Sequence, residues 1–259
     1  MLSIGLKRKE FQCSKLNHRQ MNKRCLIIGG SGDIGSRIVE KVAASNIDVA
    51  VHYRTNKDKN SDIQANIPQS RWLGSYYGDL SSEEGIEEFI DSMPKDWDML
   101  VFAPGNHSTQ LFQDITSEQM DEYYFIHVKA MWMITRALLP TMIQNKQGKI
   151  VVVSSLWGEE GASMEVLYST VKGAQISFVK ALAKEVAPSG IRVNAVTPGF
   201  ISTKMNHQLS SGETNSIFEE IPLGRAGTSE EVANGVAFLL GDQSSYITGH
   251  ILRINGGWF

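Results

Sequence analysis

The sequence has few cysteines, no long apolar run and little excess charge, and each shortage excludes a class of protein. Its only two cysteines, Cys13 and Cys25, cannot build a disulfide framework, so a reducing, cytoplasmic location is expected. No apolar run approaches the roughly 18 residues of a membrane span, and the N-terminus lacks a signal peptide's apolar stretch. A net charge of −3 gives no basic footprint for nucleic acid. We therefore expect a protein that binds neither membrane nor nucleic acid.

Residues 1–22 differ in composition from the rest of the chain. They carry five basic residues and few apolar ones, and Met21 offers an alternative start. We interpret 1–22 as a disordered or mis-assigned basic leader without an assigned function. The remaining residues, 23–259, can form one α/β domain, because 42% of the chain is hydrophobic and its length suits a single core.

Short apolar runs alternate with longer helical patterns along the chain. The runs are continuous, which is typical of parallel strands buried on both faces by crossover helices. The pattern predicts a doubly wound parallel sheet, a Rossmann fold, with helices on both faces. The expected strands are 25–28, 49–53, 97–102, 150–153, 191–196 and 252–254. The expected helices are 34–44, 82–92, 117–144, 166–186 and 229–240. The polar stretch 202–220 is predicted to be a mobile lid.

A glycine-rich turn follows the first expected strand directly. It reads Gly29-Gly30-Ser31-Gly32-Asp33-Ile34-Gly35 and opens an amphipathic helix. Glycines allow a tight turn and a close approach of phosphate, and the helix N-terminus presents N–H groups to the anion. Such turns also occur as packing corners, but the position after the first strand favours a dinucleotide site.

The next strand end indicates which dinucleotide is bound. A carboxylate there would hold the ribose hydroxyls of NAD, whereas this chain has His52-Tyr53-Arg54. A guanidinium can bind the 2′-phosphate of NADP with paired hydrogen bonds, so Arg54 favours NADPH. The alternative is a solvated surface arginine, since the stretch that follows is polar.

A serine, a tyrosine and a lysine predict a carbonyl-reducing site. Ser155 ends an apolar strand, Tyr168 follows thirteen positions later, and Lys172 comes one helical turn after the tyrosine. A ketone that accepts hydride needs a proton donor and a second hydrogen-bond donor at its oxygen, roles that suit Tyr168 and Ser155. We expect the Lys172 cation to lower the pKa of Tyr168. Tyr53 and Lys57 share the spacing but lack such an upstream serine.

With these motifs in order, residues 24–259 resemble the short-chain dehydrogenase/reductase family. Gly78-Asp79-Leu80, Asn194, Pro198-Gly199 and Thr203 also match, and the C-terminal strand is similar to that of 3-oxoacyl-(acyl-carrier-protein) reductases. The resemblance implies NADPH-dependent reduction of a ketone and a homotetramer built partly from the helices 117–144 and 166–186. It implies a catalytic set of Ser155, Tyr168, Lys172 and His127, and no metal. The implied cofactor-binding residues are Gly29, Ser31, Gly32, Asp33, Ile34, Gly35, Tyr53, Arg54, Asp79, Leu80, Ala103, Pro104, Gly105, Tyr168, Lys172, Pro198, Gly199, Ile201 and Thr203.

The sequence departs from the family pattern at three places. Asp33 replaces a glycine of the turn, and we expect it to cap the helix and to weaken cofactor binding. Phe102-Ala103-Pro104-Gly105 replaces the family's Asn-Asn-Ala-Gly, which removes asparagine hydrogen bonds. His127 replaces the asparagine of the proton relay. A histidine can pass protons near neutral pH, but a lone helical histidine is equally compatible with simple packing.

The resemblance leaves the substrate open between two ketones. One is a 3-oxoacyl group on acyl carrier protein, and the other is the 5-aminopentanone group on a lysine of elongation factor P, which a similar branch of the family reduces. Glu159, Glu160 and Glu165 would favour the cationic amine end of the second substrate, although acids are ordinary at a helix start. The alternative function is a non-catalytic NADP(H)-binding sensor or scaffold.

Overall fold

A computed structural model describes residues 22–259 except 56, 108 and 204–209, so the expected leader lies almost wholly outside the described residues. The chain forms one seven-stranded sheet in the order β3-β2-β1-β4-β5-β6-β7, and every neighbouring pair is parallel. This confirms the predicted Rossmann fold. The strands are β1 (Arg24–Ile28), β2 (Asp48–Tyr53), β3 (Trp72–Tyr77), β4 (Met99–Phe102), β5 (Gly148–Val153), β6 (Ile191–Pro198) and β7 (Ile251–Ile254).

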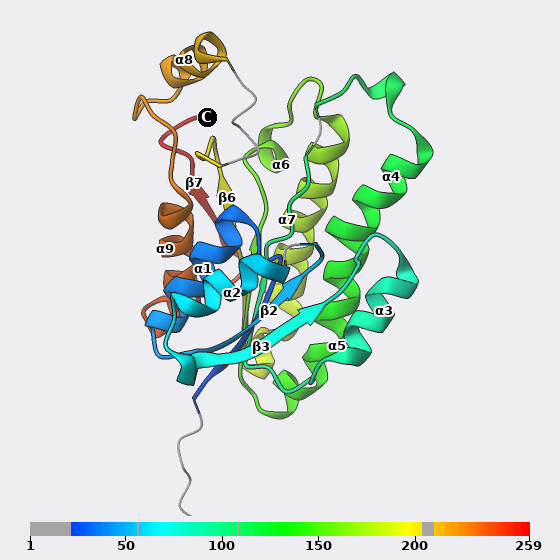
Figure 1. The fold of residues 1–259 in the computed structure, drawn as a ribbon, viewed down its shortest axis with the longest axis vertical. Helices are drawn as coiled ribbons and strands as arrows, with labels where there is room; N and C mark the ends of the chain where they lie inside the picture. Colours follow the sequence, from blue (N-terminus) through cyan, green and yellow to red (C-terminus); the bar gives the residue numbers. More distant parts are fainter. Residues whose placement is uncertain (1–21, 56, 108, 204–209) are drawn as a thin grey trace, which may run out of the picture.

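Helices cover both faces of the sheet. In Figure 1, α1, α2 and α9 lie on one side and α3, α5 and α7 on the other. Each side encloses an apolar cluster, which explains why the central strands are apolar at successive positions. The helices are α1 (Asp33–Ala44), α2 (Lys57–Ala65), α3 (Glu83–Ser92), α4 (Ser117–Tyr124), α5 (Ala130–Gln144), α6 (Trp157–Glu160), α7 (Val166–Val186), α8 (Ser211–Glu220) and α9 (Ser229–Leu240).

Among the described residues, the structure adds one strand and three α-helices to the elements expected. Strand β3 was missed because it lies at the sheet edge, where half-buried and exposed residues alternate and Gly74 interrupts the pattern. Helix α2 is polar, and α6 is only four residues long, so neither shows an apolar period. Helix α8 occupies much of the expected lid and begins with a capping box between Ser210 and Glu213. Residues 204–209 of the expected lid lie outside the described part of the chain.

The single helix expected over 117–144 is wrong in one respect. A π-helical turn, Phe125–Lys129, separates α4 from α5 and shifts the hydrogen-bond pattern by one residue. His127 lies in the middle of this turn. The sequence does not predict this irregularity, since the π-helical turn contains neither glycine nor proline.

The topology predicts where a ligand binds. The strand order reverses direction between β1 and β4, so the crossover helices leave a crevice at the carboxyl ends of these two strands. The glycine turn follows β1 at that edge, and residues 103–105 follow β4. None of the described helices is both long and apolar enough to cross a membrane.

Candidate active site

The glycine turn is shaped by contacts that exclude side chains. Gly29 has a φ of +73°, and a Cβ there would lie 2.6 Å from the carbonyl oxygen of Ala103. A Cβ on Gly35 would lie 2.2 Å from the carbonyl oxygen of Gly29. The turn is therefore packed against both the loop after β4 and the start of α1, which only glycine permits. Its cradle fits a pyrophosphate at the N-terminus of α1.

Asp33 does not cap α1 as expected. The N-cap position belongs to Gly32, and Asp33 is the first residue of the helix. A carboxylate in the first turn still interacts favourably with the helix dipole, but it lies where the phosphates of a dinucleotide would approach.

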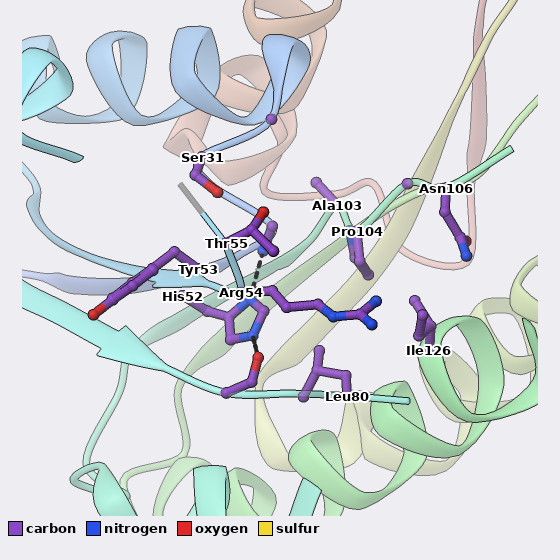
Figure 2. Close-up of a pocket in the computed structure, with 14 residues that line it drawn as sticks. Ser31, His52, Tyr53, Arg54, Thr55, Leu80, Ala103, Pro104, Asn106 and Ile126 are labelled. Atoms are coloured by element: carbon purple, nitrogen blue, oxygen red, sulfur yellow. Dashed lines mark hydrogen bonds between the residues drawn. The ribbon is translucent and has the colours of Figure 1, made fainter. Parts of the chain in front are cut away.

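Two cavities meet at the glycine turn and share Ser31, Gly32 and residues 103–105. The first, of about 310 Å³, extends over β2 toward Tyr53, Arg54 and Leu80 (Figure 2). The second, of about 350 Å³, extends over β5 and β6. Its lining contains Asp33, Ile34, Gly35, Ser155, Tyr168, Lys172, Pro198, Gly199, Ile201 and Thr203. Together the cavities give room for an extended dinucleotide across the crevice.

The structure brings Ser155, Tyr168 and Lys172 together. Ser155 follows β5, while Tyr168 and Lys172 lie one turn apart on α7. Lys172 Nζ lies 5.5 Å from the centre of the Tyr168 ring and donates a hydrogen bond of 3.1 Å to the carbonyl oxygen of Val153. Ser154 Oγ donates to the carbonyl oxygen of Lys172 at 2.9 Å. The end of β5 and the first turns of α7 are thus fixed against each other.

Burial dominates the electrostatics of this group. It raises the pKa of Tyr168 above its usual value, and the hydrogen bond with Ser155 partly opposes this effect. Burial also lowers the pKa of Lys172 to about 7. The expectation that the Lys172 cation lowers the phenol's pKa does not hold here, because desolvation outweighs any such effect.

His127 is fully buried and contacts residues of the loop after β4 and of α7. Its Nε2 lies 2.6 Å from Oδ1 of Asn106, its carbonyl oxygen accepts a 2.9 Å hydrogen bond from Gln175 Nε2, and its ring packs edge-on against Tyr168. Burial, followed by the nearby charge of Lys172, lowers the pKa of His127 well below its ordinary value. The relay prediction assumed that His127 titrates near neutral pH, and this part of the prediction is therefore wrong. His127 lines neither cavity.

Arg54 lies in the first cavity between two carboxylates. Its Nε is 3.3 Å from Asp79 Oδ1, and its Nη1 is 3.3 Å from Glu122 Oε1. In Figure 2 the guanidinium extends past Leu80 toward Ile126. Asp79 itself lines neither cavity; it contacts the site through Arg54, and it accepts hydrogen bonds from the N–H and the hydroxyl of Ser81.

Sequence reasoning did not assign several lining residues to the site. They are His52, Thr55, Gly78, Asn106, Ile126, Val153 and Ser154. One signal was available for His52, because a histidine inside an otherwise apolar strand requires a polar partner.

The three acids thought to face a cationic substrate have different surroundings. Glu159 accepts hydrogen bonds from Thr197 Oγ1 and Arg253 Nε, and Glu160 pairs with the same arginine. Their charges are thus compensated within the protein, which removes them from the charge argument. Glu165 instead lies 2.9 Å from His107 Nε2, and the His107 ring packs edge-on against Tyr168. The negative charge beside the phenol comes from Glu165.

A parallel sheet with a glycine turn at its crevice, joined to a serine, a tyrosine and a lysine, defines a dinucleotide-dependent oxidoreductase. A family model described as Enoyl-(Acyl carrier protein) reductase matches residues 30–259. The chain belongs to the short-chain dehydrogenase/reductase family, as the motifs predicted. It is an oxidoreductase, and its family uses a nicotinamide cofactor.

Relatives of this chain match it over almost its full length. The "Uncharacterized oxidoreductase YmfI" of Bacillus subtilis (strain 168) is 46% identical over 92% of this chain and 99% of its own. The "3-oxoacyl-(acyl-carrier-protein) reductase FabG" of Aquifex aeolicus is 36% identical over 92% of this chain and 97% of its own.

Solved structures agree with the fold. A putative 2-deoxy-d-gluconate 3-dehydrogenase from Agrobacterium tumefaciens with bound NADP is 28% identical, with a TM-score of 0.84 over 91% of this chain and 96% of its own. A short-chain dehydrogenase/reductase from Brucella melitensis, titled as a glucose/ribitol dehydrogenase, is 26% identical, with a TM-score of 0.83 over 92% of this chain and 97% of its own.

Proposed function

We propose that the protein reduces a ketone to a secondary alcohol with NADPH. The observation that carries this proposal is that Ser155, Tyr168 and Lys172 line one cavity with the first turn of α1. A substrate carbonyl and the reactive end of a dinucleotide can therefore meet beside the phenol.

The cofactor, when bound, supplies the hydride. The Ser155 hydroxyl donates a hydrogen bond to the carbonyl oxygen, and Tyr168 passes its phenolic proton to that oxygen as negative charge develops. Lys172, with a pKa near 7, carries a proton in part of the molecules at neutral pH and stabilises the phenolate left behind. His127 holds the loop after β4 through Asn106.

The decisive experiment follows NADPH absorbance with a panel of ketones. We expect Tyr168→Phe to retain NADPH binding and to lose turnover by at least about a hundredfold, the size of a general-acid contribution. The competing sensor or scaffold function predicts tight nucleotide binding without turnover in the unaltered protein as well. Turnover that survives Tyr168→Phe at the same rate would refute the proposed chemistry.

The preference for NADPH rests on Arg54 in the first cavity and on the absence of an acid at the end of β2. The bound NADP of the Agrobacterium tumefaciens neighbour supports it. Arg54→Ala should raise the KM for NADPH about tenfold, as the loss of one charge-assisted hydrogen bond predicts. It should leave the KM for NADH unchanged. Arg37→Ala, at an exposed pair with Glu40 on α1, is the matched control. Equal effects on both cofactors would contradict the assignment.

For the substrate, the FabG relatives favour a 3-oxoacyl group carried on acyl carrier protein. Glu165 beside Tyr168 favours a second candidate, the 5-aminopentanone group on elongation factor P, because its amine is cationic. Turnover of a 3-oxoacyl thioester and of the modified factor should be compared in the unaltered protein and in Glu165→Gln. A loss confined to the modified factor would select the second candidate.

The proposal includes a homotetramer in the cytoplasm. The helices expected to form the interface expose Tyr124, Trp132, Ile143 and Val166, which are each about two-fifths exposed. Light scattering of the purified protein measures the assembly, and a monomeric mass would contradict it. Cys25 is a free, buried thiol, in keeping with a reducing compartment.

A further inference from the structure

We propose that His52 is a positioning residue for the cofactor: its imidazole ring ties the glycine turn to the end of β3, and so fixes the two walls between which the adenosine half binds. This inference rests on the proposed dinucleotide site. It concerns a residue that takes no part in the chemistry and acts through the backbone of two glycines.

The ring bridges two backbone groups that belong to different elements. The N–H of Gly29 donates to His52 Nδ1 at 3.2 Å, and His52 Nε2 lies 3.0 Å from the carbonyl oxygen of Gly78. Figure 2 shows the imidazole between these two partners, with a dashed line to each. Gly29 and Gly78 both line the first cavity. The histidine thus spans the pocket's base from the turn after β1 to the segment after β3.

Those two bonds determine the protonation state of the ring. A backbone N–H can only donate, so Nδ1 must carry the lone pair, and a carbonyl can only accept, so Nε2 must carry the proton. His52 is 4% exposed, and burial lowers its pKa to about 4, which leaves the ring neutral at neutral pH. One tautomer satisfies both partners, and its N–H and lone pair face opposite sides of the cavity base.

Packing against α3 also holds the imidazole ring in place. Phe89 of α3 packs edge-on against it with 4.8 Å between ring centres, and a Cβ on Gly78 would lie only 2.8 Å from Phe89. Gly78 is also held by its own N–H, which donates to the carbonyl oxygen of Tyr53 at 3.1 Å. Because the Gly78 side is anchored independently, the bond to Nδ1 is the one that transmits this fixed position to Gly29.

The hydrogen bond between Gly29 and His52 affects nucleotide binding through the glycine turn. The carbonyl oxygen of Gly29 accepts the N–H of Gly32, which precedes the first residue of α1. Holding Gly29 therefore holds the turn that aims the helix N-terminus at the phosphates. An apolar residue would fill the same space in the core, so packing alone does not require a histidine here.

Three substitutions separate the two hydrogen bonds. His52→Asn places an amide oxygen near Nδ1 and keeps an acceptor for Gly29. His52→Gln places an amide N–H near Nε2 and keeps a donor for Gly78. His52→Phe fills the space and keeps neither. Binding of NADPH and of its adenosine half, adenosine 2′,5′-bisphosphate, should be measured by calorimetry for each, together with kcat at saturating NADPH and the thermal midpoint without ligand.

We expect His52→Phe to weaken both ligands about tenfold, as the loss of a buried hydrogen bond predicts, while kcat at saturating NADPH stays within about twofold. His52→Asn should recover most of the affinity, and His52→Gln should recover less. Equal affinity in all variants would overturn the inference. So would affinity losses that follow the thermal midpoints alone, since that pattern indicates a merely structural residue.

The tautomer offers a test that does not depend on activity. Nitrogen NMR of His52 should show an unprotonated Nδ1 and a protonated Nε2 at neutral pH, and the opposite tautomer or a charged ring would refute the bridge. Failure of the proposed function has a different signature. If the unaltered protein binds neither NADPH nor NADH while the NMR shows the bridge, the dinucleotide site is wrong, and the cofactor role of His52 falls with it.

Discussion

Lys172 is nearly inaccessible to solvent, with 2% of its surface exposed, and it donates a hydrogen bond to the carbonyl oxygen of Val153. Its pKa falls from 10.5 to about 7 because burial penalises the charged form. The unfolded chain therefore binds this proton more tightly than the folded one does, and at neutral pH the lysine lowers the stability of the fold. Groups of this kind persist where activity needs them.

We therefore expect Lys172→Met to abolish turnover and to raise the free energy of unfolding at pH 7 by about 2–4 kcal/mol, most of the penalty that the pKa shift implies. Chemical denaturation measures this change. Lys172→Arg keeps a charge at the same site and serves as the control, with no gain expected. A methionine variant less stable than the unaltered protein would contradict the argument.

Glu165 acts on the same phenol from another side. Its charge raises the pKa of Tyr168, in addition to the larger effect of burial. Glu165→Gln removes that charge, so ionisation of the phenol should move to lower pH. The pH profile of alcohol oxidation measures it. Glu159→Gln, whose carboxylate is compensated by Arg253, should leave the profile in place.

At the scale of elements, the π-helical turn sets the geometry of the site. It places His127 between Asn106 on one side and Tyr168 on the other, and Gln175 on α7 satisfies the carbonyl oxygen of His127. The turn, α7 and the loop after β4 are therefore held by one buried polar junction. In the part of the chain that the structure describes, two atoms of this junction, His127 Nδ1 and Gln175 Oε1, are buried without a hydrogen-bond partner, so the network is only partly satisfied.

Replacing Gln175 tests this junction. Gln175→Leu keeps the volume and removes the donor to His127, but it also removes Gln175 Oε1, which is itself buried without a partner, so the free energy of unfolding should fall by only about 1 kcal/mol. Turnover should also fall, because the His127 ring packs on Tyr168. Thr135→Val is the control: within the described residues the Thr135 hydroxyl is buried without a hydrogen-bond partner, so its removal should leave stability unchanged or slightly raised.

For the whole molecule, His52 makes stability depend on pH. Its folded pKa of about 4 lies below the ordinary histidine value of 6.5, so the unfolded chain gains the proton first as pH falls. The free energy of unfolding should therefore decrease between about pH 6.5 and pH 4, by up to about 3 kcal/mol from this group. His52→Phe should flatten that part of the denaturation profile. An unchanged slope would show that other groups cause the acid sensitivity.

The central sheet was readable from the sequence because its strands are buried on both faces and therefore apolar at successive positions. Edge strand β3 was not predicted from the sequence, because half of its residues face solvent. The order of glycine turn, Ser155, Tyr168 and Lys172 also followed from spacing, since strand ends and helical turns fix which side chains share one edge of the sheet.

Local sequence determined most of the strands and the long helices, the position of the crevice and the residue types around it. The tertiary structure alone decided their charge states and contacts: the raised pKa of Tyr168, the pairing of Glu159 with Arg253, and the bridge made by His52. The physical reason is that desolvation and pairing depend on atoms brought together from distant segments, such as Gly29, His52 and Gly78, whose meeting no local pattern records.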